Sequence, residues 1–254
     1  MAANDHSQEQ NQEQTDFGFA EVREAEKEGR VKEVFDSVAP KYDLMNDVLS
    51  FGMHRLWKKY AVMKAAARPG MKVLDIASGT ADLALQFAGK CAPGGEVWAT
   101  DINREMLTIG AHRLAAHGSH CQVVLCDSEQ LPFPDDYFDV VMVSFGLRNM
   151  THKGRALEEM CRVTKPGGRT LVLEFSKCAR WFAPFYDCYS FKFMPWLGSK
   201  IAGDRDSYEY LVESIRRHPP QAELARMMSE AGFGRVTWKN LTFGVCALHT
   251  GEKF

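Results

Sequence analysis

The chain has 254 residues, of which 45% are hydrophobic, and this is enough to build the core of one large α/β domain. Its formal net charge of −2 argues against a nucleic-acid partner, which requires a strongly basic surface. Seven scattered cysteines without a C-x-x-C pair indicate buried thiols in a reducing compartment and argue against a metal site. We therefore predict a protein that binds neither nucleic acid nor metal.

The N-terminal sixteen residues are polar and rich in Gln, Asn and Glu, which predicts a disordered tail over 1–16 and no signal peptide. No apolar run reaches the length of about 20 residues that a membrane span requires. These features predict a cytoplasmic protein. The remainder, 17–254, is predicted to form one domain.

Helical patterns at 20–40 and 54–67 precede an alternation of strands and helices that begins at Met71. Such an alternation is typical of a parallel sheet covered on both faces, and a turn at 165–168 leads into its fifth strand. The two final strands are separated only by LTF, which predicts an antiparallel pair because a parallel crossover needs a dozen or more residues. The expected strands are 72–77, 96–101, 122–127, 138–146, 169–176, 235–240 and 244–250, and the later helices are 80–90, 103–116, 152–164 and 220–232.

The segment VLDIASGTADLALQF, residues 73–87, runs from a strand that ends on Asp75 through a turn of small residues into a helical pattern. This is the layout of the nucleotide-binding turn after the first strand of an open α/β sheet. The turn holds one glycine, Gly79, with Ala77 and Ala81 at the other small positions, whereas a pyrophosphate requires bare glycine backbone. S-adenosylmethionine has no phosphate, so the turn favours S-adenosylmethionine over a dinucleotide.

Acids end three successive strands of the predicted sheet. Asp101 lies 22 residues after Gly79, where a carboxylate accepts hydrogen bonds from both ribose hydroxyls of an adenosine-containing cofactor. Asp127 and Ser128 are expected beside the adenine, and Asp75 beside the amino group, directly or through water. For Asp127 the alternative is a turn or helix-capping residue.

Five further segments are specific: FDSVAPKYDLMNDVLSFGMHRLWKK (35–59), SFGLRNM (144–150), VLEFSK (172–177), DSYEYLVESIRRHP (206–219) and the C-terminal ALHTGEKF. With them, the chain closely resembles the ubiquinone/menaquinone biosynthesis C-methyltransferases from residue 17 to its C-terminus. The resemblance implies a class I S-adenosylmethionine-dependent methyltransferase fold, Rossmann-like, with a mostly parallel seven-stranded sheet and an antiparallel last strand. The implied reaction methylates a ring carbon of a polyprenylated quinol: demethylmenaquinol to menaquinol, or 2-polyprenyl-6-methoxy-1,4-benzoquinol to its methylated product.

The resemblance also implies cofactor-binding positions, which are Thr80, Asp101, Asp127, Ser128 and Ser144. The chain departs from the family in the turn, where A-G-G-T-G-D is usual and ASGTAD stands here. Ser78 and Ala81 thus replace glycines. If either position has a positive φ, we expect cofactor affinity to fall by about 1 kcal/mol.

Candidate catalytic residues follow from the chemistry of a quinol, whose ring carbon becomes nucleophilic when a hydroxyl ionises. Arg148 follows the fourth strand, at the edge where open α/β sheets carry out chemistry. It either stabilises the quinolate or forms a structural salt bridge. Asn149 either binds the quinol or caps the helix at 152–164.

Further candidates lie in the segment 17–68, which is predicted to fold over the site as a helical lid. His54 and Tyr42, with Asp43, are expected to reach the quinol from this lid. Glu174, at the end of the fifth strand, is a weaker candidate.

The segment 177–218 is predicted as a substrate insertion, because residues 181–196 hold eight aromatics in sixteen positions. These rings either pack on the core or form a groove for the prenyl chain. The segment 53–68 carries five Lys/Arg, no acid and interleaved Trp57, which fits either a solvated helix face or an interfacial helix at the inner face of the membrane. A homo-oligomer and a quinone-biosynthesis complex both stay open.

Two other functions remain as alternatives. An O-methyltransferase of a small phenol shares the cofactor half of the site. A non-catalytic subunit that binds prenyl lipid in a quinone-synthesis complex fits if the altered turn has abolished methyl transfer.

Overall fold

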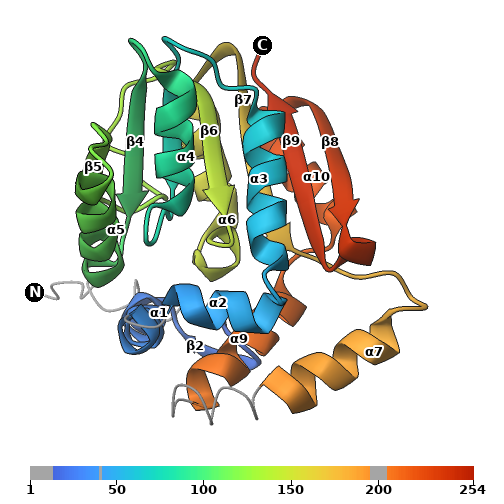
Figure 1. Cartoon of the computed structure of the whole chain (residues 1–254). Coiled ribbons are helices and arrows are strands. Elements are labelled where there is room, and N and C mark those ends of the chain that lie inside the picture. The colour runs from blue at the N-terminus through green and yellow to red at the C-terminus, as the bar shows by residue number, and fades with distance from the viewer. Residues whose placement is uncertain (1–13, 40–41, 195–204) are drawn as a thin grey trace, which may run out of the picture.

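A computed structural model of the chain describes residues 14–39, 42–194 and 205–254 and contains one seven-stranded sheet between layers of helices (Figure 1). Its strands are β3 (Lys72–Ile76), β4 (Glu96–Asp101), β5 (Gln122–Leu125), β6 (Phe138–Ser144), β7 (Thr164–Phe175), β8 (Gly234–Leu241) and β9 (Cys246–Glu252). They lie in the order β5-β4-β3-β6-β7-β9-β8. Strands β3 to β7 pair in parallel, whereas β9 is antiparallel to both neighbours, which confirms the predicted topology.

Both faces of the sheet are buried, as a parallel sheet requires. One face is covered by α3 (Met53–Ala65), α4 (Asp82–Cys91) and α5 (Arg104–Ala116), and the other by α6 (Lys153–Val163) and α10 (Gln221–Glu230). The neighbouring residues Val73 and Leu74 of β3 are both fully buried but belong to opposite cores. Successive strand residues point to opposite faces, so a continuous apolar run is what such a strand needs.

The N-terminal region differs from the sequence prediction. A hairpin of β1 (Gln14–Phe17) and β2 (Ala20–Arg23) precedes α1 (Glu24–Val38), so residues 14–16 of the predicted tail form a strand. Residues 1–13 lie outside the described residues. The helix α2 (Tyr42–Ser50) was not predicted, since no single face of it repeats over enough residues to stand out.

The predicted turn at 165–168 lies instead within β7, as an irregularity in its pairing with β6. Gly167 has a φ of 80° there, which a glycine adopts at little cost. The prediction of a turn was therefore wrong in kind, although the glycines do mark a break in the regular ladder.

A further layer of helices lies beyond the carboxyl ends of the parallel strands, below the arrowheads in Figure 1. It consists of α1, α2, α7 (Ala183–Cys188), its π-helical continuation η4 (Tyr189–Phe193) and α9 (Arg205–Arg217), and we call it the cover layer. The layer has its own core, in which Val38, Met45, Leu49, Met194, Tyr208 and Val212 are buried together. Segments far apart in the sequence thus close over the edge where the three acids end their strands.

Candidate active site

The turn between β3 and α4, residues 77–81, has a left-handed backbone at Ala77, Gly79 and Ala81, with φ of 50°, 54° and 59°. Glycines lie opposite both alanines. A Cβ added to Gly146 would lie 2.5 Å from the Cβ of Ala77, and one added to Gly110 would lie 3.0 Å from the Cβ of Ala81. The conformational cost expected for a replaced glycine therefore applies to Ala81 but not to Ser78, which has no positive φ.

Asp101, at the end of β4, joins this turn to the next loop. Its two carboxylate oxygens accept hydrogen bonds from the backbone N–H of Gly79 and of Asn103, each at 2.8 Å. Burial raises the pKa of Asp101, and these two N–H donors oppose the rise. Asp127 accepts a hydrogen bond from the backbone N–H of Glu129 at 2.8 Å, the turn role that the alternative interpretation expected.

Two adjoining cavities lie between the strand ends and the cover layer. One, of about 300 Å³, is lined by Asp101, Asp127, Ser128 and Asn149, and we call it the acidic cavity. The other, of about 360 Å³, is lined mainly by apolar side chains of the cover layer, and we call it the aromatic cavity. Both include residues that the sequence predicted for the cofactor or the substrate: Tyr42, Gly79 and Ser144 line both, and Asp75, Thr80, His54 and Arg148 line the aromatic cavity.

Three buried polar side chains at the wall of the aromatic cavity lack hydrogen-bond partners among the described residues. They are the carboxylate of Asp75 and the hydroxyls of Ser78 and Ser144. Burial raises the pKa of Asp75 to about 8, while the charge of Lys58 opposes that rise. Buried polar groups are normally paired, so this set fits a ligand that brings a cation and several hydrogen-bonding groups.

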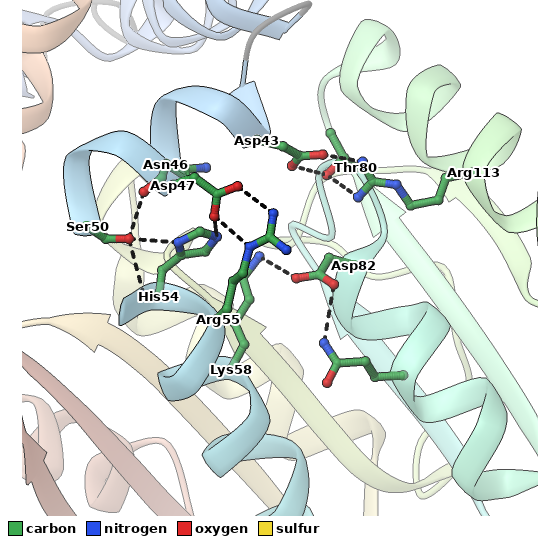
Figure 2. Close-up of polar contacts among 11 residues, drawn as sticks. Asp43, Asn46, Asp47, Ser50, His54, Arg55, Lys58, Thr80, Asp82 and Arg113 are labelled. Atoms are coloured by element: carbon green, nitrogen blue, oxygen red, sulfur yellow. Dashed lines mark hydrogen bonds and ion pairs between the residues drawn. The ribbon is translucent and has the colours of Figure 1, made fainter. Parts of the chain in front are cut away.

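Helix α2 is joined to the β3–α4 turn by an ionic cluster (Figure 2). The carboxylate of Asp43 accepts a hydrogen bond from the Thr80 hydroxyl at 3.0 Å and pairs with the guanidinium of Arg113 on α5. Arg113 also donates to the Thr80 hydroxyl oxygen at 3.1 Å. The sequence prediction missed Arg113, because this contact joins residues 70 positions apart and no local pattern signals it.

His54 lies at the end of the aromatic cavity formed by α2 and α3 (Figure 2). Its Nδ1 lies 2.8 Å from the Ser50 hydroxyl, and its Nε2 lies 3.8 Å from Asp47, which also pairs with Arg55. Burial and the positive charge of Lys58 lower the pKa of His54, against the opposing charge of Asp47. The imidazole is therefore neutral near pH 7.

Arg148 and Glu174 form a buried ion pair with Nη1 3.2 Å from Oε1, so the salt-bridge interpretation of Arg148 is correct for one edge of the guanidinium. The backbone N–H of Arg148 also donates to Glu174 at 3.2 Å. Burial raises the pKa of Glu174, and the charge of Arg148 opposes that rise. Arg148 still lines the aromatic cavity, where its guanidinium lies over the ring of Phe175 at 5.5 Å.

Asn149 does not cap α6, because His152 occupies the N-cap position there. Its side-chain oxygen accepts a hydrogen bond from the hydroxyl of Tyr210, on α9, at 3.1 Å. Asn149 thus fixes the cover layer to the loop after β6, next to the acidic cavity. The predicted helix-capping role was wrong, while contact with a ligand stays a prediction.

The aromatic residues of the predicted insertion divide between core and surface. Phe182, Tyr186 and Tyr189 line the aromatic cavity and pack against the core, whereas Trp181 and Phe191 are exposed. Trp196 lies outside the described residues. On α3, Trp57 is buried and donates to the hydroxyl of Thr242 at 2.9 Å, so the expectation that it lies at a lipid interface was wrong.

A family model described as the ubiE/COQ5 methyltransferase family matches residues 23–253. The chain belongs to this family. Among its relatives, the ubiquinone/menaquinone biosynthesis C-methyltransferase UbiE of Ralstonia nicotianae is 60% identical over 240 residues, or 94% of this chain and 99% of that protein. The protein of the same name from Cupriavidus metallidurans is 58% identical over 241 residues, or 95% of this chain and 99% of that protein. The family predicted from the sequence motifs is thereby confirmed.

Solved structures similar to this member of the ubiE/COQ5 family share its fold at low identity. The cyclase SpnF has a TM-score of 0.64 at 17% identity and covers 88% of this chain and 94% of its own. A SAM-dependent methyltransferase from Aquifex aeolicus has a TM-score of 0.53 at 19% identity, with 76% and 88% covered. These likenesses confirm the class I methyltransferase fold and carry no statement about the reaction, because one fold supports many.

Proposed function

We propose that this chain transfers a methyl group from S-adenosylmethionine to a ring carbon of a polyprenylated quinol in menaquinone or ubiquinone biosynthesis. The relatives that it matches over almost their whole length are named for this C-methyltransferase role. The observation that carries the proposal is the pair of adjoining cavities, one lined by acids and the other by aromatic rings, with Arg148 in the aromatic one. Together they suit a nucleoside cofactor beside an apolar ring and tail.

The residues present fit the cofactor. Asp101 would accept hydrogen bonds from the ribose hydroxyls through its remaining lone pairs, and Asp127 and Ser128 would hold the adenine. The buried carboxylate of Asp75 would bind the amino group, and the Thr80 and Ser144 hydroxyls would complete the pocket. S-adenosylmethionine, when bound, supplies an electrophilic methyl group on a positively charged sulfur.

The quinol ring is proposed to lie in the aromatic cavity against Arg148. The guanidinium would stabilise the negative charge that appears when a ring hydroxyl ionises. Its pairing with Glu174 holds the guanidinium in one orientation, at the price of part of its net charge. The neutral imidazole of His54 lines the same cavity and is the candidate acceptor of the hydroxyl proton, with Tyr42 as a further contact.

The prenyl chain is proposed to leave the cavity past Phe51 and Phe185, both of which line it and are highly exposed. Trp181 and Phe243 form an exposed ring pair nearby, stacked on Phe182. An apolar mouth of this kind favours peripheral association of a cytoplasmic protein with the membrane that holds the quinol. None of the described helices is long and apolar enough to cross a membrane. Assembly into a homo-oligomer or a quinone-biosynthesis complex stays a prediction.

Residues 17–68 are proposed to act as a lid, because the Asp43–Arg113–Thr80 cluster is the polar link between α2 and the β3–α4 turn. Opening of this link would admit the cofactor, and closing would exclude water from the reacting groups.

The proposal is tested with isotope-labelled methyl donor and both quinol types, followed by product analysis. A methyl group on a ring carbon of either quinol supports it, and a preference for one ring identifies the pathway. A methyl group on oxygen would indicate the phenol O-methyltransferase, and cofactor binding without transfer would indicate the non-catalytic subunit. In the same assay, Phe185→Ser should raise KM for a long-chain quinol far more than for a truncated analogue.

A further inference from the structure

His218 is a buried histidine without a visible partner for its ring. It follows α9, is only 3% exposed, and neither ring nitrogen has a hydrogen-bond partner among the described residues. Its backbone N–H donates to the Ser214 carbonyl at 3.1 Å, so the residue continues the helical turn and is held in place. A buried imidazole with both nitrogens unpaired is unfavourable, so the ring has to be explained.

The guanidinium of Arg148 has a matching unpaired group. Its Nη1 bonds Glu174 and the Phe145 carbonyl, whereas its Nε is buried without a partner. Arg148 begins the hydrogen-bonded stretch to which α9 is attached, since the next residue, Asn149, accepts from Tyr210 of α9. The helix that carries His218 is therefore fixed beside the residue that carries the unpaired Nε–H.

The charges around His218 define its protonation. Burial lowers its pKa well below the usual range, and Lys153, Arg148 and His249 lower it further. The neutral ring has one N–H donor and one nitrogen that accepts. An arginine Nε–H can only donate, so the acceptor nitrogen of His218 has the complementary chemistry.

We propose that an internal water molecule bridges the Nε–H of Arg148 and the acceptor nitrogen of His218, which makes His218 a positioning residue for the guanidinium. A buried water normally bonds two to four polar groups and is part of the structure. The bridge and Glu174 then hold different edges of the guanidinium, which leaves it little freedom to rotate in the aromatic cavity. The inference rests on the proposed function only where it concerns turnover.

The test compares His218→Leu, which removes the acceptor, with His218→Asn, which keeps a polar group of smaller size. We expect His218→Leu to lower kcat about tenfold with unchanged affinity for S-adenosylmethionine, and His218→Asn to restore most of that loss. In an Arg148→Lys background, which lacks the Nε–H, His218→Leu should change kcat less than twofold. His249→Leu is the matched control, because His249 is equally buried but bonds the Gln221 carbonyl. Its kcat should stay unchanged.

Two readouts do not depend on the methyl-transfer assay. A high-resolution crystal structure should contain one water within hydrogen-bond distance of both nitrogens, and its absence overturns the proposal. The melting temperature should fall in His218→Leu, because a bridged group is lost; a rise with unchanged kcat would mean that the ring is unpaired in the native protein. If no quinol is methylated but the bridging water is present, the proposed function fails while this inference stands.

Discussion

The two cavities of the site are built in different ways. The acidic cavity takes its polar groups from the ends of consecutive strands, β3, β4 and β5, which parallel pairing brings to one edge. The aromatic cavity is closed by α1, α2, α3, α7 and α9, from residue 34 to residue 211, and the link between α2 and the turn is ionic. The cofactor half is thus a property of the sheet, and the substrate half is a property of long-range packing.

The largest expected effect is on the cofactor half. Asp101→Ala should weaken S-adenosylmethionine binding about a hundredfold or more, because two charge-assisted hydrogen bonds of about 1.5–3 kcal/mol each are lost. Calorimetric titration measures this. Asp101→Asn, which keeps an acceptor for the Gly79 N–H, controls for misfolding of the turn. Unchanged affinity in a folded alanine variant would refute the ribose assignment.

The substrate half is tested next by Arg148→Ala. It should lower kcat by about a hundredfold, or about 3 kcal/mol, with S-adenosylmethionine affinity nearly unchanged, since one preorganised electrostatic contact is removed. Arg148→Lys keeps the charge but not the planar fork and should lower kcat less. A much lower melting temperature with normal turnover per folded molecule would instead make Arg148 only the structural partner of Glu174.

Asp75 gives a pH-dependent test of the boundary between the halves. With a pKa of about 8 it is protonated at pH 7 in the cofactor-free protein but ionised when unfolded, so stability falls as pH rises from about 4 to 8. If Asp75 meets the amino group of the cofactor, binding at pH 7 should release close to one proton. Titration in two buffers of different protonation enthalpy measures this release. Asp75→Asn should abolish it, and release that persists in the variant assigns the proton to another group.

The smallest expected effect concerns the left-handed alanine of the turn. Ala81→Gly should raise S-adenosylmethionine affinity up to about fivefold, or about 1 kcal/mol, because glycine adopts a φ of 59° without a steric penalty. Ser78→Gly is the matched control and should change affinity less, since Ser78 has no positive φ. A clear loss of affinity in Ala81→Gly would mean that the methyl group is needed to pack against Gly110.

The sequence by itself determined the sheet, the family and the positions of the strand-end acids. Strand runs such as KVLDI and the motif SFGLRNM are local, and parallel pairing converts their ends into one edge without further information. The sequence did not predict the hairpin β1–β2, because its pairing depends on contacts with α1 and α9.

Only the tertiary structure decided the partners of the site residues. Arg148 meets Glu174 across 26 positions, and Asp43 meets Arg113 across 70. It also decided that Ala81 has a left-handed backbone, that Trp57 is buried and that His218 comes to lie beside Arg148. The physical reason is that hydrophobic periodicity specifies which face of an element is buried, whereas charge pairing depends on which elements meet, and that is fixed only when the whole chain has packed.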